Sequence, residues 1–131
     1  QNTIFRYAGL TTRGLAMKRL LKIAAVLIGL APAAASAQQW GAVCIGPGGA
    51  WGYAHSYGSE SGAYNRALQE SQYDCEEVRT FFNTCAAMAV ASNGGWGWST
   101  GNSRGQAEAG AMSYCRQYGS GCQVRVWACS G

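Results

Sequence analysis

The sequence is poor in the residues on which most enzymes and metal sites depend. Only 12% of its 131 residues are charged, and it has one histidine, His55, and one aspartate, Asp74. Zinc sites and catalytic triads both require several placed nitrogen, sulfur or oxygen groups. A sequence with a single imidazole therefore favours neither a zinc site nor a catalytic triad.

Long apolar runs are also scarce: the stretch from Leu20 to Ala31 could be interpreted as a membrane anchor, but it falls short of the roughly 20 residues that a spanning helix needs. This stretch follows the cations Lys18 and Arg19 and precedes the small residues Ala35-Ser36-Ala37. The pattern predicts that residues 17–37 are a secretory signal peptide, cleaved after Ala37. We expect a bacterial protein that is periplasmic or secreted, with no stable membrane insertion after cleavage.

Cleavage would leave residues 38–131 as one small domain with a different charge balance. The full chain has a formal net charge of +4, but this domain contains no lysine and has five arginines against six acidic residues, about −1. Nucleic acids and anionic lipids attract clustered cations, so we predict no nucleic-acid partner. Residues 1–16 precede the methionine of the signal peptide and are interpreted as a non-native upstream extension.

Cysteine, by contrast, is abundant in this short domain. An even number in an exported chain favours three disulfides, each adding roughly 2–4 kcal/mol of stability to a core that is small for its surface. Six cysteines allow fifteen pairings. They are Cys44, Cys75, Cys85, Cys115, Cys122 and Cys129.

The domain contains an internal repeat, at about residues 40–84 and 85–131. Aligning Trp51-Gly-Tyr53 with Trp96-Gly-Trp98 brings two apolar segments into register, each ending in a turn that contains glycine. In each unit a short strand, a turn and a returning strand are typical of a hairpin. A helix and a closing strand follow, which predicts the order β-β-α-β twice.

Serines mark the starts of the two helices. Ser103 with Gln106 forms the capping-box pattern, and either Ser59 or Ser61 can cap the first helix. Small residues recur every four positions on both helices, which lets each lie close on a sheet. These residues are Ala63, Ala67 and Ser71, then Ala107, Ala111 and Cys115. The predicted fold is α+β, with a duplicated β-β-α-β unit, small antiparallel sheets, two short helices and disulfide staples.

The repeat favours one set of disulfides among the fifteen. Cys115 ends the second helix seven residues before Cys122, a spacing suited to joining that helix to the closing strand. Ser71 occupies the position equivalent to Cys115, so Cys75 needs another partner. Pairing Cys44 with Cys75 and Cys85 with Cys129 then follows by elimination.

Four segments carry a family resemblance. They are Trp40-Gly-Ala-Val, Gly95-Trp-Gly-Trp, Ala107-x-x-x-Ala-x-x-x-Cys115 and Cys122-x-Val-x-Val-Trp-x-Cys129. Together they resemble the bacterial "domain of unknown function 4189" family of small exported proteins, over residues 40–130. The resemblance implies no activity and no catalytic residues. As a weaker association, it implies a periplasmic immunity protein that partners a secreted antibacterial toxin.

Catalysis and metal binding are the less favoured interpretations. His55 is the only imidazole that could act as a base, but Asp74 is distant in sequence and no Gly-x-Ser-x-Gly motif is present. The acidic cluster Asp74, Glu76 and Glu77 lacks the spacing of a calcium loop. A glycosidase pair among Glu60, Glu70 and Glu108 would use carboxylates that we expect to be solvated. We predict no metal, no cofactor and no catalytic residue.

The strongest candidate site is an aromatic stripe formed by Trp51, Tyr53 and His55 with its counterpart Trp96 and Trp98. Alternation along a strand sends these rings to one face and small residues to the other. If the helices cover the small face, the rings are free to bind a partner, since Trp and Tyr dominate interface hot spots and stack on sugars. The alternative, slightly favoured, is that the rings form the core.

These observations predict a non-enzymatic exported module that binds another protein, with inhibition of a toxin or envelope hydrolase as its concrete form. The alternative is a carbohydrate- or peptidoglycan-binding module that uses the aromatic stripe. A small envelope hydrolase ranks third.

Overall fold

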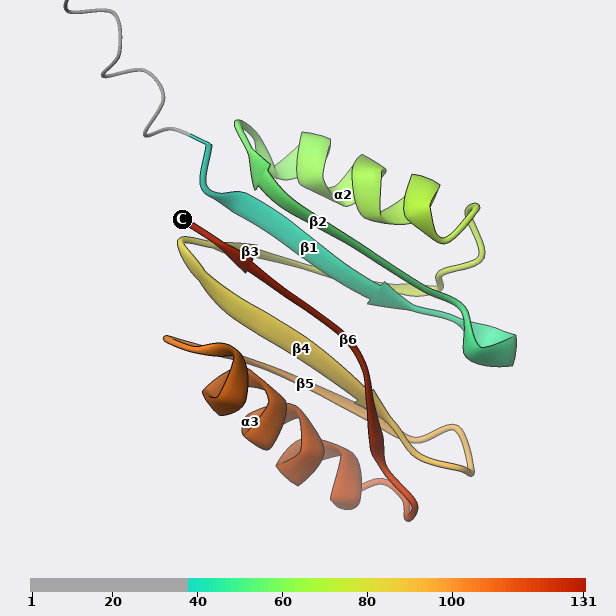
Figure 1. Cartoon of the computed structure of the whole chain (residues 1–131). Coiled ribbons are helices and arrows are strands. Elements are labelled where there is room, and N and C mark those ends of the chain that lie inside the picture. Colours follow the sequence, from blue (N-terminus) through green and yellow to red (C-terminus); the bar gives the residue numbers. More distant parts are fainter. Residues whose placement is uncertain (1–37) are drawn as a thin grey trace, which may run out of the picture. The chain divides into compact units, whose positions relative to one another are not determined.

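The computed structural model of the chain describes residues 38–131 (Figure 1). The signal peptide and the upstream extension predicted above lie outside this range. Two units follow each other in the order strand, strand, helix, strand. The first consists of β1 (Trp40–Ile45), β2 (Trp51–Tyr57), α2 (Glu60–Glu70) and β3 (Glu77–Phe82), and the second of β4 (Thr84–Val90), β5 (Trp96–Gly101), α3 (Arg104–Arg116) and β6 (Gln123–Ser130). The predicted α+β class and the duplicated unit are confirmed.

Each unit forms its own antiparallel three-stranded sheet with the first strand in the centre. The orders are β2-β1-β3 and β5-β4-β6. The central strands β1 and β4 are apolar along almost their whole length and are buried on both faces. This is possible because one face of each sheet packs against its own helix and the other faces the second sheet, so that the layers run α2, sheet, sheet, α3 (Figure 1).

The core lies in three layers. Larger side chains fill the space between the sheets, where Val43, Ile45 and Phe81 of the first unit meet Met88 and Val126 of the second. Beneath each helix the buried residues are mostly alanine and cysteine. Small side chains at the predicted four-residue spacing thus let the helices approach the sheets closely.

Glycine on the second strand of each unit completes this close approach. A Cβ atom at Gly52 would overlap the carbonyl oxygen of Ala67 in α2, and one at Gly97 would overlap the backbone nitrogen of Cys115 in α3. The bare faces of β2 and β5 are therefore the faces that the helices cover. Trp51, Tyr53 and His55 of β2 and Trp96 and Trp98 of β5 lie on the other faces. Tyr57, at the end of β2 after the irregular pairing, packs on the α2 side instead.

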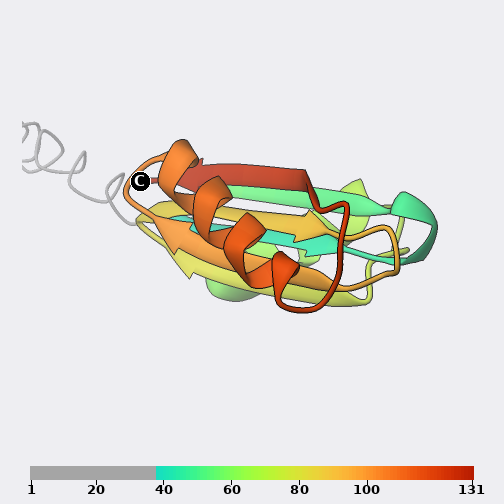
Figure 2. The same cartoon turned by 90° about the horizontal axis from the view of Figure 1, so that it is seen from below.

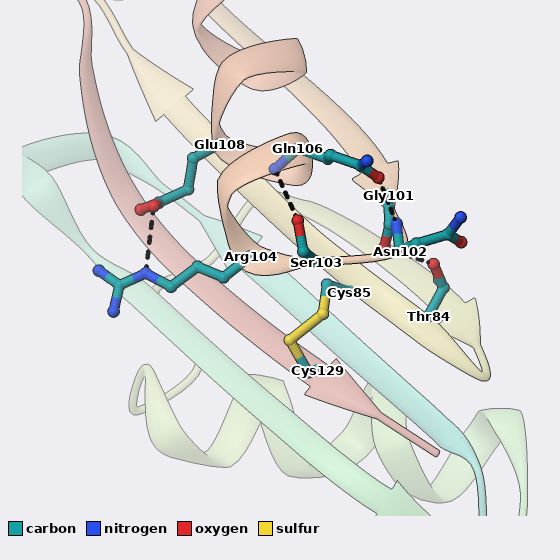
Figure 3. The surroundings of a disulfide bond; sticks show 9 residues. All are labelled: Thr84, Cys85, Gly101, Asn102, Ser103, Arg104, Gln106, Glu108 and Cys129. Atoms are coloured by element: carbon teal, nitrogen blue, oxygen red, sulfur yellow. Dashed lines mark hydrogen bonds and ion pairs between the residues drawn. A yellow bond between two sulfur atoms is a disulfide. The ribbon is translucent and has the colours of Figure 1, made fainter.

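Both helices begin at the predicted serines. The hydroxyl of Ser59 accepts a hydrogen bond from the N–H of Gly62 at 3.1 Å, and that of Ser103 accepts one from the N–H of Gln106 at 3.2 Å. The side-chain oxygen of Gln106 accepts from the N–H of Asn102 at 2.9 Å, so the second helix has a nearly reciprocal cap (Figure 3).

All six cysteines form disulfides, in the pairing that the repeat favoured: Cys44 with Cys75, Cys85 with Cys129 and Cys115 with Cys122. Cys85 and Cys129 lie directly opposite each other on β4 and β6, with their Cα atoms 3.9 Å apart (Figure 3). Each bond joins two residues of the same unit. None of the helices described by the structure is long and apolar enough to cross a bilayer.

Candidate functional site

Three aromatic side chains form a row along the edge strand β2. These are Trp51, Tyr53 and His55, called the β2 aromatic row below. Trp51 is 47% exposed and Tyr53 is 37% exposed. The ring centroids of neighbours lie 6.1 Å and 6.3 Å apart, with interplanar angles of 13° and 5°. Alternation along the strand thus produces a series of nearly parallel, accessible rings.

The β2 aromatic row borders a shallow groove of about 500 Å³, whose other wall is strand β6. Residues Arg125 to Cys129 supply this wall. Trp127 is 40% exposed, and the guanidinium of Arg104 lies 4.1 Å from the centre of its ring. Arg104 also donates to a carboxylate oxygen of Glu108 at 3.1 Å (Figure 3). This second contact orients the guanidinium that lies over the indole of Trp127.

Trp96 and Trp98 lie elsewhere, on the edge strand β5 of the second sheet. Both are partly buried and pack against the core between the sheets. The guanidinium of Arg79 on β3 lies 5.0 Å from the centre of the Trp96 ring. Because β5 faces β3 while β2 faces β6, the two halves of the predicted stripe occupy opposite edges of the molecule (Figure 2).

Whether the aromatic rings of the predicted stripe lie in the core or on the surface therefore differs between the two units. The second-unit rings contribute to the core, whereas the first-unit rings are largely accessible. Short side chains such as Val126 and Ala128 let β6 approach β1 and β2 closely, so the longer rings of β2 extend past it. The five predicted residues do not form one continuous surface.

His55 has a hydroxyl neighbour but no acidic one. Its Nδ1 lies 3.2 Å from the Oγ of Ser56, both side chains are exposed, and no other side-chain hydrogen bond of His55 is found within residues 38–131. Ser56 adopts a left-handed backbone conformation, with φ of 61°, where the pairing of β1 and β2 becomes irregular. Its N–H donates to the hydroxyl of Ser130. The pair therefore lacks the third group that orients the base in a triad.

The acidic side chains considered for catalysis are separated and engaged elsewhere. Glu60 accepts a hydrogen bond from Thr80 at 2.8 Å, and Glu70 and Glu108 each pair with an arginine four residues away on the same helix. Within residues 38–131 no three His, Cys, Asp or Glu side chains gather in a way that could hold a metal ion.

Sequence reasoning missed the β6 wall of the groove. The available signal was the alternation along 123–130, which places Arg125 and Trp127 on the same side of the strand. It also missed Tyr114 and Tyr118 on the α3 side of β5, both more than half exposed. Neither set can be assigned to a surface until the packing of the two sheets is known.

Comparison with known proteins gives the same fold and one family. The NMR structure of Rv1813c from Mycobacterium tuberculosis is similar, with 28% identity and a TM-score of 0.55, over 70% of this chain and 75% of that one. None of the curated proteins matches the sequence. A family model described as "Domain of unknown function (DUF4189)" matches residues 40–129. Since this match spans most of the chain, the chain belongs to that family.

Proposed function

We propose that this chain is an exported, non-enzymatic module that binds another protein, acting as an immunity-type inhibitor of a secreted toxin or an envelope hydrolase. The β2 aromatic row, with Trp127 across the groove, is its binding surface. The observation that carries this proposal is the exposure of Trp51 and Tyr53 as parallel rings beside a groove in a disulfide-bonded domain.

Composition supports a protein partner. Trp, Tyr and Arg are the residues that most often dominate binding energy at interfaces, and the groove combines Trp51, Tyr53 and Trp127 with Arg125 at its rim. Six acids elsewhere in the domain keep its net charge close to neutral, so binding would depend on these rings more than on long-range attraction.

Strand pairing and a disulfide hold the backbone that carries this surface. The β2 aromatic row lies on a strand that pairs with the central strand β1, and Cys129 at the end of the groove is bonded to Cys85 on β4. A backbone that is already constrained loses little conformational entropy on association, which favours affinity.

Export is the second part of the proposal. Three disulfides persist in oxidising compartments such as the bacterial periplasm, and the sequence of residues 17–37 has the pattern of a secretory signal. A fractionation experiment tests this part: the mature chain is expected in the periplasmic or culture fraction with Gln38 as its first residue.

Titration of the protein against a toxin encoded beside its gene, or against envelope hydrolases, tests the inhibitor. Inhibition is expected to saturate at a fixed molar ratio, because each molecule occupies one target. Trp51→Ala should weaken binding by about 2 kcal/mol or more, the scale of a hot spot, and His55→Ala by about 1 kcal/mol or less. Inhibition at substoichiometric amounts that His55→Ala abolishes would instead indicate an enzyme.

A glycan partner is the second candidate, favoured by the near-parallel planes of the three rings along one strand. Aromatic rings present apolar faces on which sugar rings stack. A peptidoglycan sedimentation assay distinguishes the two: retention that Trp51→Ala removes and Tyr73→Ala leaves unchanged would support the glycan and count against the inhibitor.

A further inference from the structure

Arginines provide all the permanent positive side-chain charge of residues 38–131, which contain no lysine. Three of them form ion pairs with a carboxylate of their own unit: Arg66 with Glu70, Arg79 with Glu77 and Arg104 with Glu108. Neither Arg116 nor Arg125 forms an ion pair with any residue of this range, and both are exposed. Arg116 lies in the last turn of α3, whereas Arg125 borders the groove beside the β2 aromatic row.

A break in the pairing of β6 with β4 lies at Arg125. Met88 pairs with Val126, and the next residue, Ala89, pairs with Val124. Arg125 is therefore an extra residue on β6 with no partner on β4, which is the arrangement of a β-bulge. Bulges beside functional sites change the direction of a side chain. Here the side chain of Arg125 is exposed, while that of Val126 is buried between the sheets.

The first unit shows what the equivalent arginine does without a bulge. In the alignment of the two units Arg79 corresponds to Arg125, and β3 pairs with β1 in unbroken register. Arg79 donates to a carboxylate oxygen of Glu77 at 3.3 Å, and its guanidinium lies 5.0 Å from the centre of the Trp96 ring. The second unit has Gln123 at the position of Glu77. Arg125 thus lacks the carboxylate that its counterpart has.

The guanidinium of Arg125 lies at the Trp51 end of the groove. A Cβ atom added to Gly49 would be 3.5 Å from its Nη1 atom, so the guanidinium reaches the turn that ends two residues before Trp51. Guanidinium groups carry N–H donors in a planar fork that matches the two oxygens of a carboxylate. The free cation therefore stands beside the first ring of the β2 aromatic row.

No carboxylate of the described residues borders this groove, which is lined by the β2 aromatic row and residues 125–129. Arg125 also borders a second cavity, together with Glu76 and Glu77, but pairs with neither of them. The other cation near the groove, Arg104, is already paired on its own helix. The groove thus combines one unpaired cation with apolar rings, although the domain as a whole is slightly acidic.

We propose that the groove binds an acidic segment of the partner protein. An Asp or Glu side chain of that segment pairs with Arg125, and apolar side chains next to it pack on the β2 aromatic row. This inference rests on the proposed function, because it describes the partner of the same surface. Hydrogen bonds between arginine and carboxylate are short, strong and directional. A basic segment would instead bring a like charge against Arg125, which disfavours the wrong partners.

Selection from a displayed library of random peptide segments tests the proposal on the oxidised protein. Fixed residues flank each segment on both sides, so that no free C-terminal carboxylate is offered. The selected segments are expected to be enriched in Asp and Glu next to apolar residues. Selection on Arg125→Gln should lose this enrichment. Arg116→Gln removes the other unpaired arginine, far from the groove lining in the last turn of α3, and should retain it.

Dissociation constants of the selected segments, prepared as synthetic peptides, give the size of the effect. Arg125→Gln should weaken binding about three- to tenfold, the range for a partly exposed charged pair, and Arg125→Glu should weaken it further. Replacing the peptide's acidic residue with its amide should cost the same factor with the unchanged protein and nothing more with Arg125→Gln, since the two changes remove one interaction. The peptide replacement tests the pair even if a protein variant does not fold.

The outcomes separate this inference from the proposed function. Neutral or basic segments that bind through Trp51 would overturn the acidic partner and leave the protein-binding surface intact. Acidic segments that bind equally well to Arg125→Gln would do the same. The absence of any segment whose binding Trp51→Ala weakens would overturn both. Binding of a polyuronate that depends on Arg125, without enrichment of acidic segments, would assign the groove to an anionic glycan and overturn the inference.

Discussion

Single glycines determine how closely the helices pack on the sheets. Gly97→Ala would force a Cβ atom into the backbone of α3 near Cys115, and overpacking of this kind typically costs about 1–3 kcal/mol. Gly58→Ala is the matched control, because a Cβ atom there has nothing within 4 Å. Its stability should change by about 0.5 kcal/mol or less. Urea unfolding of both variants provides the measurement, and equal midpoints would contradict the packing described.

The tryptophans of the predicted stripe are expected to contribute differently to stability in the two units. Trp98 packs against the core, so Trp98→Ala should lower the free energy of unfolding by about 2–3 kcal/mol, somewhat less than for a fully buried Trp. Trp51 is 47% exposed, so Trp51→Ala should cost about 1 kcal/mol or less. Thermal unfolding of the two variants tests this contrast. A larger loss for Trp51→Ala would place that ring in the core.

The elements themselves follow from local signals in the sequence. Ser59 and Ser103 mark the helix starts, and small residues every four positions mark the helix faces that become buried. These signals extend over only a few residues, so one amino-acid sequence is enough to detect them. The internal repeat also predicted the disulfide pairing, because it showed which cysteines lie on equivalent elements of the two units.

The candidate site followed from the sequence only in part. Trp51 and Trp96 are each followed by a glycine and a second aromatic residue, and this shared pattern does not distinguish the exposed ring from the packed one. The difference arises when the sheets pack, which brings β6 beside β2 and β5 beside β3. For the same reason Trp127 and Arg125 could not be assigned to the groove.

The disulfides should make unequal contributions to the free energy of unfolding. The pair Cys85–Cys129 spans 44 residues and Cys115–Cys122 spans seven. If a disulfide acts mainly by restricting the unfolded chain, replacing the first pair with alanines should cost about 1.5 kcal/mol more than replacing the second. Unfolding of the two double variants in denaturant tests this. A larger loss for the short loop would show that contacts in the folded state dominate.

At the scale of the whole molecule, the two units depend on each other. Val43 and Phe81 of the first pack directly against Met88 and Val126 of the second, so either unit alone would expose one face of its sheet. Peptides 38–83 and 84–131, each oxidised, should lack cooperative unfolding when separate and regain it when mixed. Circular dichroism melting curves of the separate and mixed peptides provide the measurement. A cooperative transition in one peptide alone would show that the shared core is dispensable.

The confinement of every disulfide to one unit has a consequence for how the bonds are made. In a chain that enters an oxidising compartment from its N-terminus, Cys44 and Cys75 are the first two thiols to arrive, and they are native partners. The first unit can therefore be oxidised correctly without an isomerase. The second unit cannot, since Cys115 arrives before Cys129 and is the earlier partner for Cys85. Loss of disulfide isomerase activity should therefore cause mispaired molecules whose errors lie in the second unit.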